Sequence, residues 1–140
     1  MPFIAAELQA FASGFPLAIL HLLLSLFIWA VSFALHTALA PGRPIDQVRH
    51  GNGAATVAVG GVMLSLALPL GAAMAVSAST AEAALWGAAI SVIQLLLLRV
   101  ADMALRGLPE RIRDGDITAA VLISCARLAV AILLACAVLR

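Results

Sequence analysis

Four long apolar segments dominate the sequence and set its expected fold. They cover residues 16–40, 54–77, 83–105 and 118–139, and the charged residues gather mainly in the polar stretches between them. Each segment meets or exceeds the roughly 20 residues that an α-helix needs to cross the hydrocarbon core of a bilayer. The sequence has no ten-residue segments of alternating polarity, which are typical of membrane β-barrel strands. The pattern therefore predicts an all-α membrane protein, a bundle of four transmembrane helices.

The composition agrees with this prediction and excludes an ordinary soluble domain. Hydrophobic residues make up 64% of the 140 residues and charged residues 11%, whereas about a quarter of the residues of a typical soluble domain are charged. A soluble core of this size could bury one or two such helices, but not four. The net charge of +1 and the acid-balanced loops give no indication of nucleic-acid binding.

Residues 1–15 precede the first apolar segment and contain no Lys or Arg. Their hydrophobic residues fall on one side of a helix, which predicts a segment that lies along the membrane interface or is flexible. The alternative is a signal peptide, because Ala-Leu-Ala at 38–40 resembles a cleavage site. The lack of a basic N-terminal region and the length of the apolar run argue against cleavage.

The arginines predict the orientation of the helices. The loops at 41–53 and 106–117 contain five arginines, whereas the opposite side of the predicted bundle contains only Arg140. Basic residues accumulate in cytoplasmic loops. We therefore expect both loops in the cytoplasm and both termini on the other side of the membrane.

Two parts of the chain match each other without a gap. Residues 45–70 align with residues 109–134, and the loop sequence Val-Arg-His-Gly-Asn falls on Ile-Arg-Asp-Gly-Asp. We interpret the match as an internal repeat whose units, 16–77 and 78–140, are each a helical hairpin. Because each unit crosses the membrane twice, the two units have the same orientation and form parallel repeats.

Asn52 and Asp116 occupy equivalent positions in the two units, and each stands directly before an apolar segment. A side-chain oxygen at this position can accept a hydrogen bond from a free backbone N–H of the first helical turn. Ion binding is the alternative use of such a pair. We favour helix N-capping, which places both residues at the cytoplasmic loops.

Charged residues also lie inside the third and fourth segments. Arg99, Asp102 and Arg106 are spaced to share one helix face, and Arg127 follows Asp116 by eleven residues, near the middle of the fourth segment. A charge at this depth costs at least a few kcal/mol. Side chains lean toward the N-terminus of their own helix, so those of Arg127 and Asp102 lean toward each other. We predict an ion pair between them, with Arg99 competing for the carboxylate; the pair either fixes helix register or lines a wet pathway.

Other polar residues within the segments have simpler expected roles. Gln94, midway along the third segment, is expected to form an interhelical hydrogen bond, with pore lining as the alternative. Pro69 is expected to kink the second segment. His21 and His36 are about 22 Å apart on one helix, and we interpret each as an interfacial or packed polar residue.

The sequence contains no nucleophile paired with a base and no cluster of metal ligands. Cys125 and Cys136 are eleven residues apart on one predicted helix, a separation of about 16 Å that prevents a disulfide between them. We therefore expect no enzymatic activity, no cofactor and no metal.

Several short motifs carry a resemblance to a known family. They are the Asn-x-Ala-Ala entry at 52–55, Pro-Leu at 69–70, Trp-Gly at 86–87 and Gln-Leu at 94–95. With these motifs the chain resembles the YjfL-like small bacterial inner-membrane proteins, domain of unknown function family 350, from about Phe33 to Leu139. The resemblance implies a four-helix protein of tandem two-helix units in the bacterial inner membrane, with no established biochemical activity. In that membrane, the orientation predicted from the arginines makes both termini periplasmic.

The resemblance and the intramembrane charges lead to two interpretations of function. The first is a non-enzymatic membrane component or scaffold in envelope maintenance, as the resemblance implies. The alternative is a small oligomeric ion channel or transporter that uses Arg127, Asp102, Arg99 and Gln94. Small residues at four-residue spacing favour close helix packing and association between copies. The basic loops are compatible with protein partners in the cytoplasm or membrane.

Overall fold

The computed structural model describes residues 2–140, which form six helices. The helices are α1 (Pro2–Leu39), α2 (Pro44–Arg49), α3 (Gly53–Val76), α4 (Thr80–Ala104), α5 (Leu108–Arg113) and α6 (Ile117–Val138). Residues 2–140 contain no strand. Four of the helices, α1, α3, α4 and α6, are long and apolar enough to cross a membrane. The predicted all-α membrane bundle is therefore confirmed.

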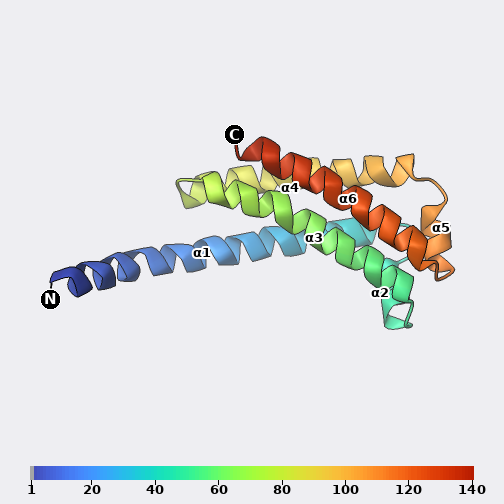
Figure 1. Cartoon of the computed structure of the whole chain (residues 1–140), viewed down its shortest axis with the longest axis horizontal. Coiled ribbons are helices and arrows are strands. Elements are labelled where there is room, and N and C mark those ends of the chain that lie inside the picture. Colours follow the sequence, from blue (N-terminus) through green and yellow to red (C-terminus); the bar gives the residue numbers. More distant parts are fainter. Residues whose placement is uncertain (1) are drawn as a thin grey trace.

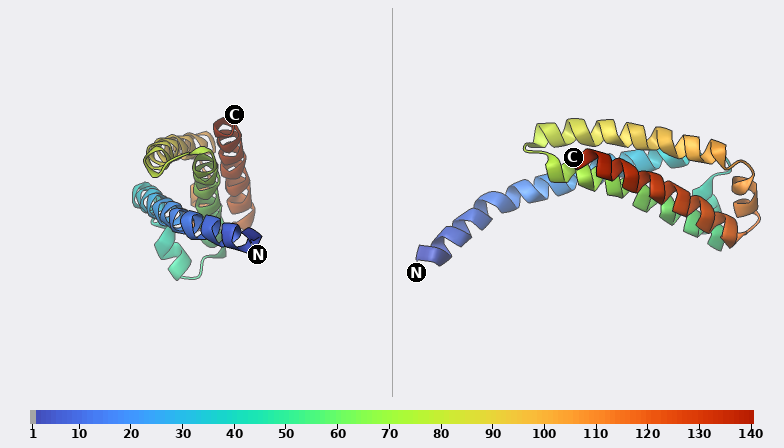
Figure 2. Two further views of the ribbon diagram at one scale, coloured as in Figure 1. Left: turned by 90° about the vertical axis from the view of Figure 1, so that its left-hand side faces the viewer. Right: turned by 45° about the horizontal axis from the view of Figure 1, so that its top comes forward.

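Helices α3 and α4 form the centre of the bundle. Each contacts the other and both outer helices, α1 and α6, which lie on opposite sides (Figure 2). The short helices α2 and α5 lie at one end, which we call the short-helix end (Figure 1). Helices α1 and α4 run toward this end and α3 and α6 run away from it.

Helix α1 continues as one helix from Pro2 to Leu39 with Pro16 inside it. The expected division of residues 1–15 from the first hairpin remains a prediction. A proline removes one backbone hydrogen bond, a loss that membrane helices tolerate. The 38 residues make a helix about 57 Å long, and its N-terminal part projects beyond the bundle (Figure 1).

The most extensive contact in the bundle is between α3 and α6. Small buried residues line it on α3, where Ala54, Ala58 and Gly61 lie, and on α6, where Ala120 and Ser124 lie. A methyl group added at Gly61 would stand 2.5 Å from the Ser124 hydroxyl oxygen. The two backbones therefore approach so closely that only glycine fits. The small-residue faces of α3 and α6 are thus used within the chain.

The loops that precede α3 and α6 share one backbone geometry. Gly51 and Gly115 have φ angles of +83° and +90°, a left-handed conformation that favours glycine. The N–H groups of Gly51 and Gly115 donate to the carbonyls three residues earlier, and those of Asn52 and Asp116 donate to the carbonyls five residues earlier. The residues with matching backbone geometry are the same ones that the sequence alignment of residues 45–70 with 109–134 pairs.

Helix α3 runs without a break through Pro69, which is buried. Because proline has no N–H, the carbonyl of Ser65 lacks its usual partner within the helix. Ser65 is fully buried, and its hydroxyl donates to the carbonyl of Val62 at 2.9 Å. The kink expected at Pro69 remains a prediction.

Candidate functional site

A cavity of about 480 Å³ lies at the short-helix end, with walls from all four long helices. Helix α4 diverges from α3 and α6 toward this end, where α5 connects α4 to α6 (Figures 1 and 2). The charged residues that line the cavity are Arg99, Asp102, Arg106, Glu110 and Arg127. A charged cavity inside a small membrane bundle makes this region the candidate site.

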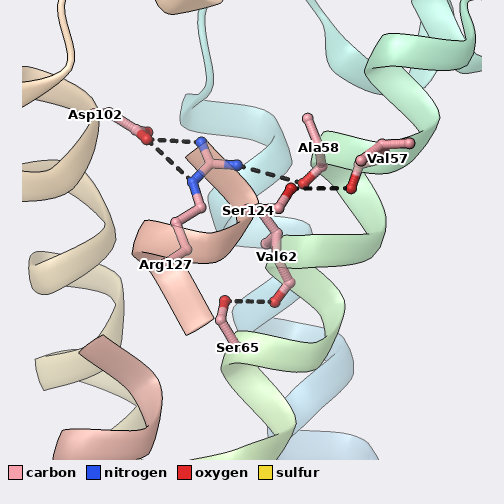
Figure 3. Close-up of polar contacts among 7 residues, drawn as sticks. All are labelled: Val57, Ala58, Val62, Ser65, Asp102, Ser124 and Arg127. Carbon is pink, nitrogen blue, oxygen red and sulfur yellow. Dashed lines mark hydrogen bonds and ion pairs between the residues drawn. The ribbon is translucent and has the colours of Figure 1, made fainter. Parts of the chain in front are cut away.

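The predicted ion pair between Arg127 and Asp102 is present at the inner side of this cavity. The guanidinium donates to Asp102 Oδ1 from Nη2 at 2.7 Å and from Nε at 3.2 Å. The two side chains are only 9% and 17% exposed. Arg127 Nη1 also donates to the carbonyl of Ala58 at 3.4 Å (Figure 3). Arg127 therefore connects α6 to both central helices, α3 and α4.

Arg99 does not compete for the Asp102 carboxylate. It lines the same cavity, but within residues 2–140 the structure contains no ion pair for Arg99 or Arg106. The expected competition is therefore not seen, and Arg127 makes two hydrogen bonds to Oδ1 of Asp102. Two guanidinium groups are left in the cavity without a carboxylate partner from the described residues.

Gln94 does not form the interhelical hydrogen bond that the sequence predicted. Its side chain is completely buried, and neither its amide nitrogen nor its amide oxygen has a hydrogen-bond partner among residues 2–140. On α4 it lies eight residues from Asp102, or about 12 Å deeper in the bundle. A buried amide without partners is unfavourable by about 1–3 kcal/mol, so its presence calls for a functional explanation.

His36 belongs to the site, although the sequence indicated only an interfacial or packed polar residue. It lines the cavity, is 4% exposed, and its Nδ1 has no hydrogen-bond partner among the described residues. The sequence places His36 near the end of α1, but it contains no signal for the register of α1 against α4. Only the packed structure brings this imidazole to the cavity that holds Arg127 and Asp102.

Asn52 and Asp116 both cap helices in the structure. Asn52 Oδ1 accepts from the N–H of Ala55, and Asp116 Oδ1 accepts from the N–H of Ala119, each at 3.1 Å. The second polar atom of each side chain, Nδ2 of Asn52 and Oδ2 of Asp116, bonds a different kind of partner. Asn52 Nδ2 donates to the carbonyl of Ile112 at 2.9 Å, which ties the start of α3 to the end of α5. Asp116 Oδ2 instead accepts from Arg111 Nε at 2.9 Å.

Replacing each capping residue with the residue type of the other should therefore change the stability of the protein to different extents. The N–H of Ala119, and next the Arg111 side chain, hold the pKa of Asp116 below its ordinary value of 3.8. A carboxylate with a lowered pKa stabilises the fold above pH 3.8, and this stabilisation is lost as the pH falls below that value. Asp116→Asn keeps the cap but should flatten this acid dependence. Asn52→Asp removes the donor to Ile112 and should cost about 1–2 kcal/mol at neutral pH.

Thermal unfolding of both variants in detergent between pH 3 and pH 7 measures these effects. Equal destabilisation by the two exchanges at pH 7 would contradict the distinct roles of the two caps. The wild-type protein serves as the control for the acid dependence that Asp116→Asn is expected to reduce.

Among residues 2–140 the structure shows no group of three or more His, Cys, Asp or Glu residues that could hold a metal ion. Cys125 and Cys136 are exposed on α6, away from the cavity lining.

Comparison with known proteins gives one family. The family model described as Domain of Unknown Function (DUF350) matches residues 10–138, which include the three later long helices and most of α1. No curated protein and no solved structure matches the chain. The family match agrees with the resemblance that the motifs at 52–55, 69–70 and 86–87 indicated.

Proposed function

We propose that this chain, which belongs to the DUF350 family, is a non-enzymatic multi-pass membrane protein that admits a small charged solute into its cavity. The observation that carries the proposal is the cavity itself, whose inner side carries the buried Arg127–Asp102 pair. The admitted solute would use this pair and the polar groups beyond it in transport or conduction.

The arrangement of polar side chains supports a pathway for a solute rather than an ion pair that only fixes the register of the helices. A pair that only fixed register could be fully enclosed by apolar neighbours, but here both partners line a cavity together with His36 and Arg99. Deeper along α4, the amide of the completely buried Gln94 has no hydrogen-bond partner among residues 2–140. Charged and polar groups within a membrane typically mark such pathways.

The bacterial inner membrane is the proposed location, with the short-helix end in the cytoplasm and both termini in the periplasm. The arginines concentrated in and beside α2 and α5 support this orientation. The cavity would then open toward the cytoplasm. We further propose that the two hairpins are parallel repeats, which the shared loop geometry before α3 and α6 supports.

Ion efflux from proteoliposomes tests the proposed function. The wild-type protein is expected to raise the efflux of phosphate, chloride or potassium above that of empty liposomes. Gln94→Leu should reduce this efflux several-fold while leaving stability unchanged or higher by about 1 kcal/mol, because it removes an amide without partners. The control is Cys136→Ala, which changes an exposed residue of α6. Efflux no faster than from empty liposomes for all three ions would contradict the proposal.

A scaffold in envelope maintenance is the second candidate, favoured by the projecting part of α1. There the exposed residues Ile4, Leu8, Phe11 and Phe15 recur at helical spacing, and the rings of Phe11 and Phe15 stack with centroids 5.1 Å apart. This stripe projects beyond the bundle and is available to a partner (Figure 1). An absence of efflux together with a stoichiometric co-purifying membrane protein would favour this second function.

A further inference from the structure

We infer that the cavity binds an organic phosphate, with Arg99 and Arg106 as the residues that hold the phosphate group. This inference rests on the proposed function and names the class of solute that the cavity admits. Three features of the cavity carry it: the charge balance, the free arginines and the apolar walls.

The charge balance of the cavity favours an anion. Three arginines and two carboxylates line it, which gives a formal charge of +1. Arg127 and Asp102 neutralise each other through two hydrogen bonds, so the Asp102 carboxylate presents little repulsion to an incoming anion. The remaining carboxylate, Glu110, is exposed on α5. A cationic solute would meet the opposite balance and be disfavoured.

Two arginines of the cavity, Arg99 and Arg106, have no ion-pair partner within residues 2–140. Arg99 lies on α4, whereas Arg106 lies in the turn after the helix ends at Ala104 and so does not share the helix face expected from the sequence. Both residues line the cavity. Arg106 is exposed at the mouth, whereas Arg99 is partly buried deeper in the cavity. Arg106 is thus suited to attract an anion and Arg99 to hold it. The planar guanidinium matches two oxygens of a phosphate at once.

The size and walls of the cavity indicate a phosphate attached to a larger body. A volume of about 480 Å³ lies within the range of about 300–1,000 Å³ that is typical of small-molecule sites, and far exceeds what inorganic phosphate needs. Phe33, Val62 and Ile123 contribute apolar wall. The ligand class is therefore a phosphate ester, which a soluble metabolite or a phospholipid headgroup could supply.

Thermal unfolding of the purified protein in non-ionic detergent tests this inference with three probes. They are glycerol 3-phosphate, phosphatidylglycerol in mixed micelles, and the dication putrescine; phosphatidylcholine is the lipid control. A ligand that binds only the folded state raises the unfolding midpoint in a saturable manner. We expect this for one of the two phosphate probes, with at least a tenfold weaker apparent affinity in both Arg99→Gln and Arg106→Gln.

The matched control is Arg49→Gln, which changes an exposed arginine of α2 that does not line the cavity. A response to glycerol 3-phosphate supports a soluble ligand, and a response to phosphatidylglycerol alone supports a lipid headgroup. No saturable response to either phosphate probe, or equal weakening by Arg49→Gln, would overturn the inference. Stabilisation by putrescine alone would also overturn the phosphate inference, but it would leave the proposed admission of a charged solute intact. Phosphate binding without efflux would support the phosphate site and contradict the proposed transport.

Discussion

Replacing Asp102 with Asn or Arg127 with Met is expected to destabilise the protein by about 3 kcal/mol in each case, because either change leaves a buried charge without its partner. The Arg127 side chain is 9% exposed and that of Asp102 17% exposed, so most of each charged group's surface is covered by the protein. Methionine is a suitable replacement because Met63 aligns with Arg127 when residues 45–70 are set against residues 109–134. Chemical unfolding in detergent micelles measures both free energies.

The double variant distinguishes a true pair from two independent sites. With both charges removed, we expect a destabilisation at least about 2 kcal/mol smaller than the sum of the single effects. Arg99→Gln provides a control, since Arg99 lines the same cavity but forms no ion pair within residues 2–140. Additive single effects would show that the pair contributes nothing to stability.

The second large effect is expected at the crossing of α3 and α6. Gly61→Ala should destabilise the bundle by about 2–3 kcal/mol, because the new methyl group meets Ser124 and the helices must separate. The clash involves the Ser124 backbone as well, whose Cα would lie 3.0 Å from the added carbon. Separation would also break the hydrogen bond from the Ser124 hydroxyl to the carbonyl of Val57, now 3.2 Å long (Figure 3).

A neighbouring glycine supplies the control for this prediction. A methyl group added at Gly60 would meet nothing within 4 Å, so Gly60→Ala should be neutral or stabilising through its better helix propensity. Adding Ser124→Gly to Gly61→Ala removes the two nearest clashing atoms and should restore part of the lost stability. If the Gly60 and Gly61 variants unfold at the same midpoint, the close approach of α3 and α6 is not required for stability.

The expectations that the structure met rest on short-range chemistry. Asn52 and Asp116 stand directly before apolar runs, and a cap needs only its own first helical turn. The four spans follow from the length and polarity of continuous segments. The ion pair of Arg127 with Asp102 could also be foreseen, since α4 and α6 are joined by one short connection that constrains their relative depth.

The expectations for Arg99 and Gln94 failed, because neighbouring side chains decide both outcomes. Arg127 bonds the Asp102 carboxylate, and Arg99 forms no ion pair within residues 2–140. The hydrogen bond expected for Gln94 is also absent among residues 2–140. Local sequence indicates that Gln94 is polar and deep, but it does not specify what faces it.

The sequence by itself determined four membrane spans, the family, the helix caps and the charges of the fourth and third spans. The tertiary structure alone decided that α4 diverges to leave a cavity, that His36 lines it, and that Arg99 stays without a carboxylate partner within residues 2–140. The physical reason is that lipid is as apolar as a helix interface, so the side facing a neighbour need not differ in hydrophobicity from the side facing the bilayer. Register and divergence instead follow from close packing at Gly61 and from individual polar contacts such as that of Arg127 with Ala58.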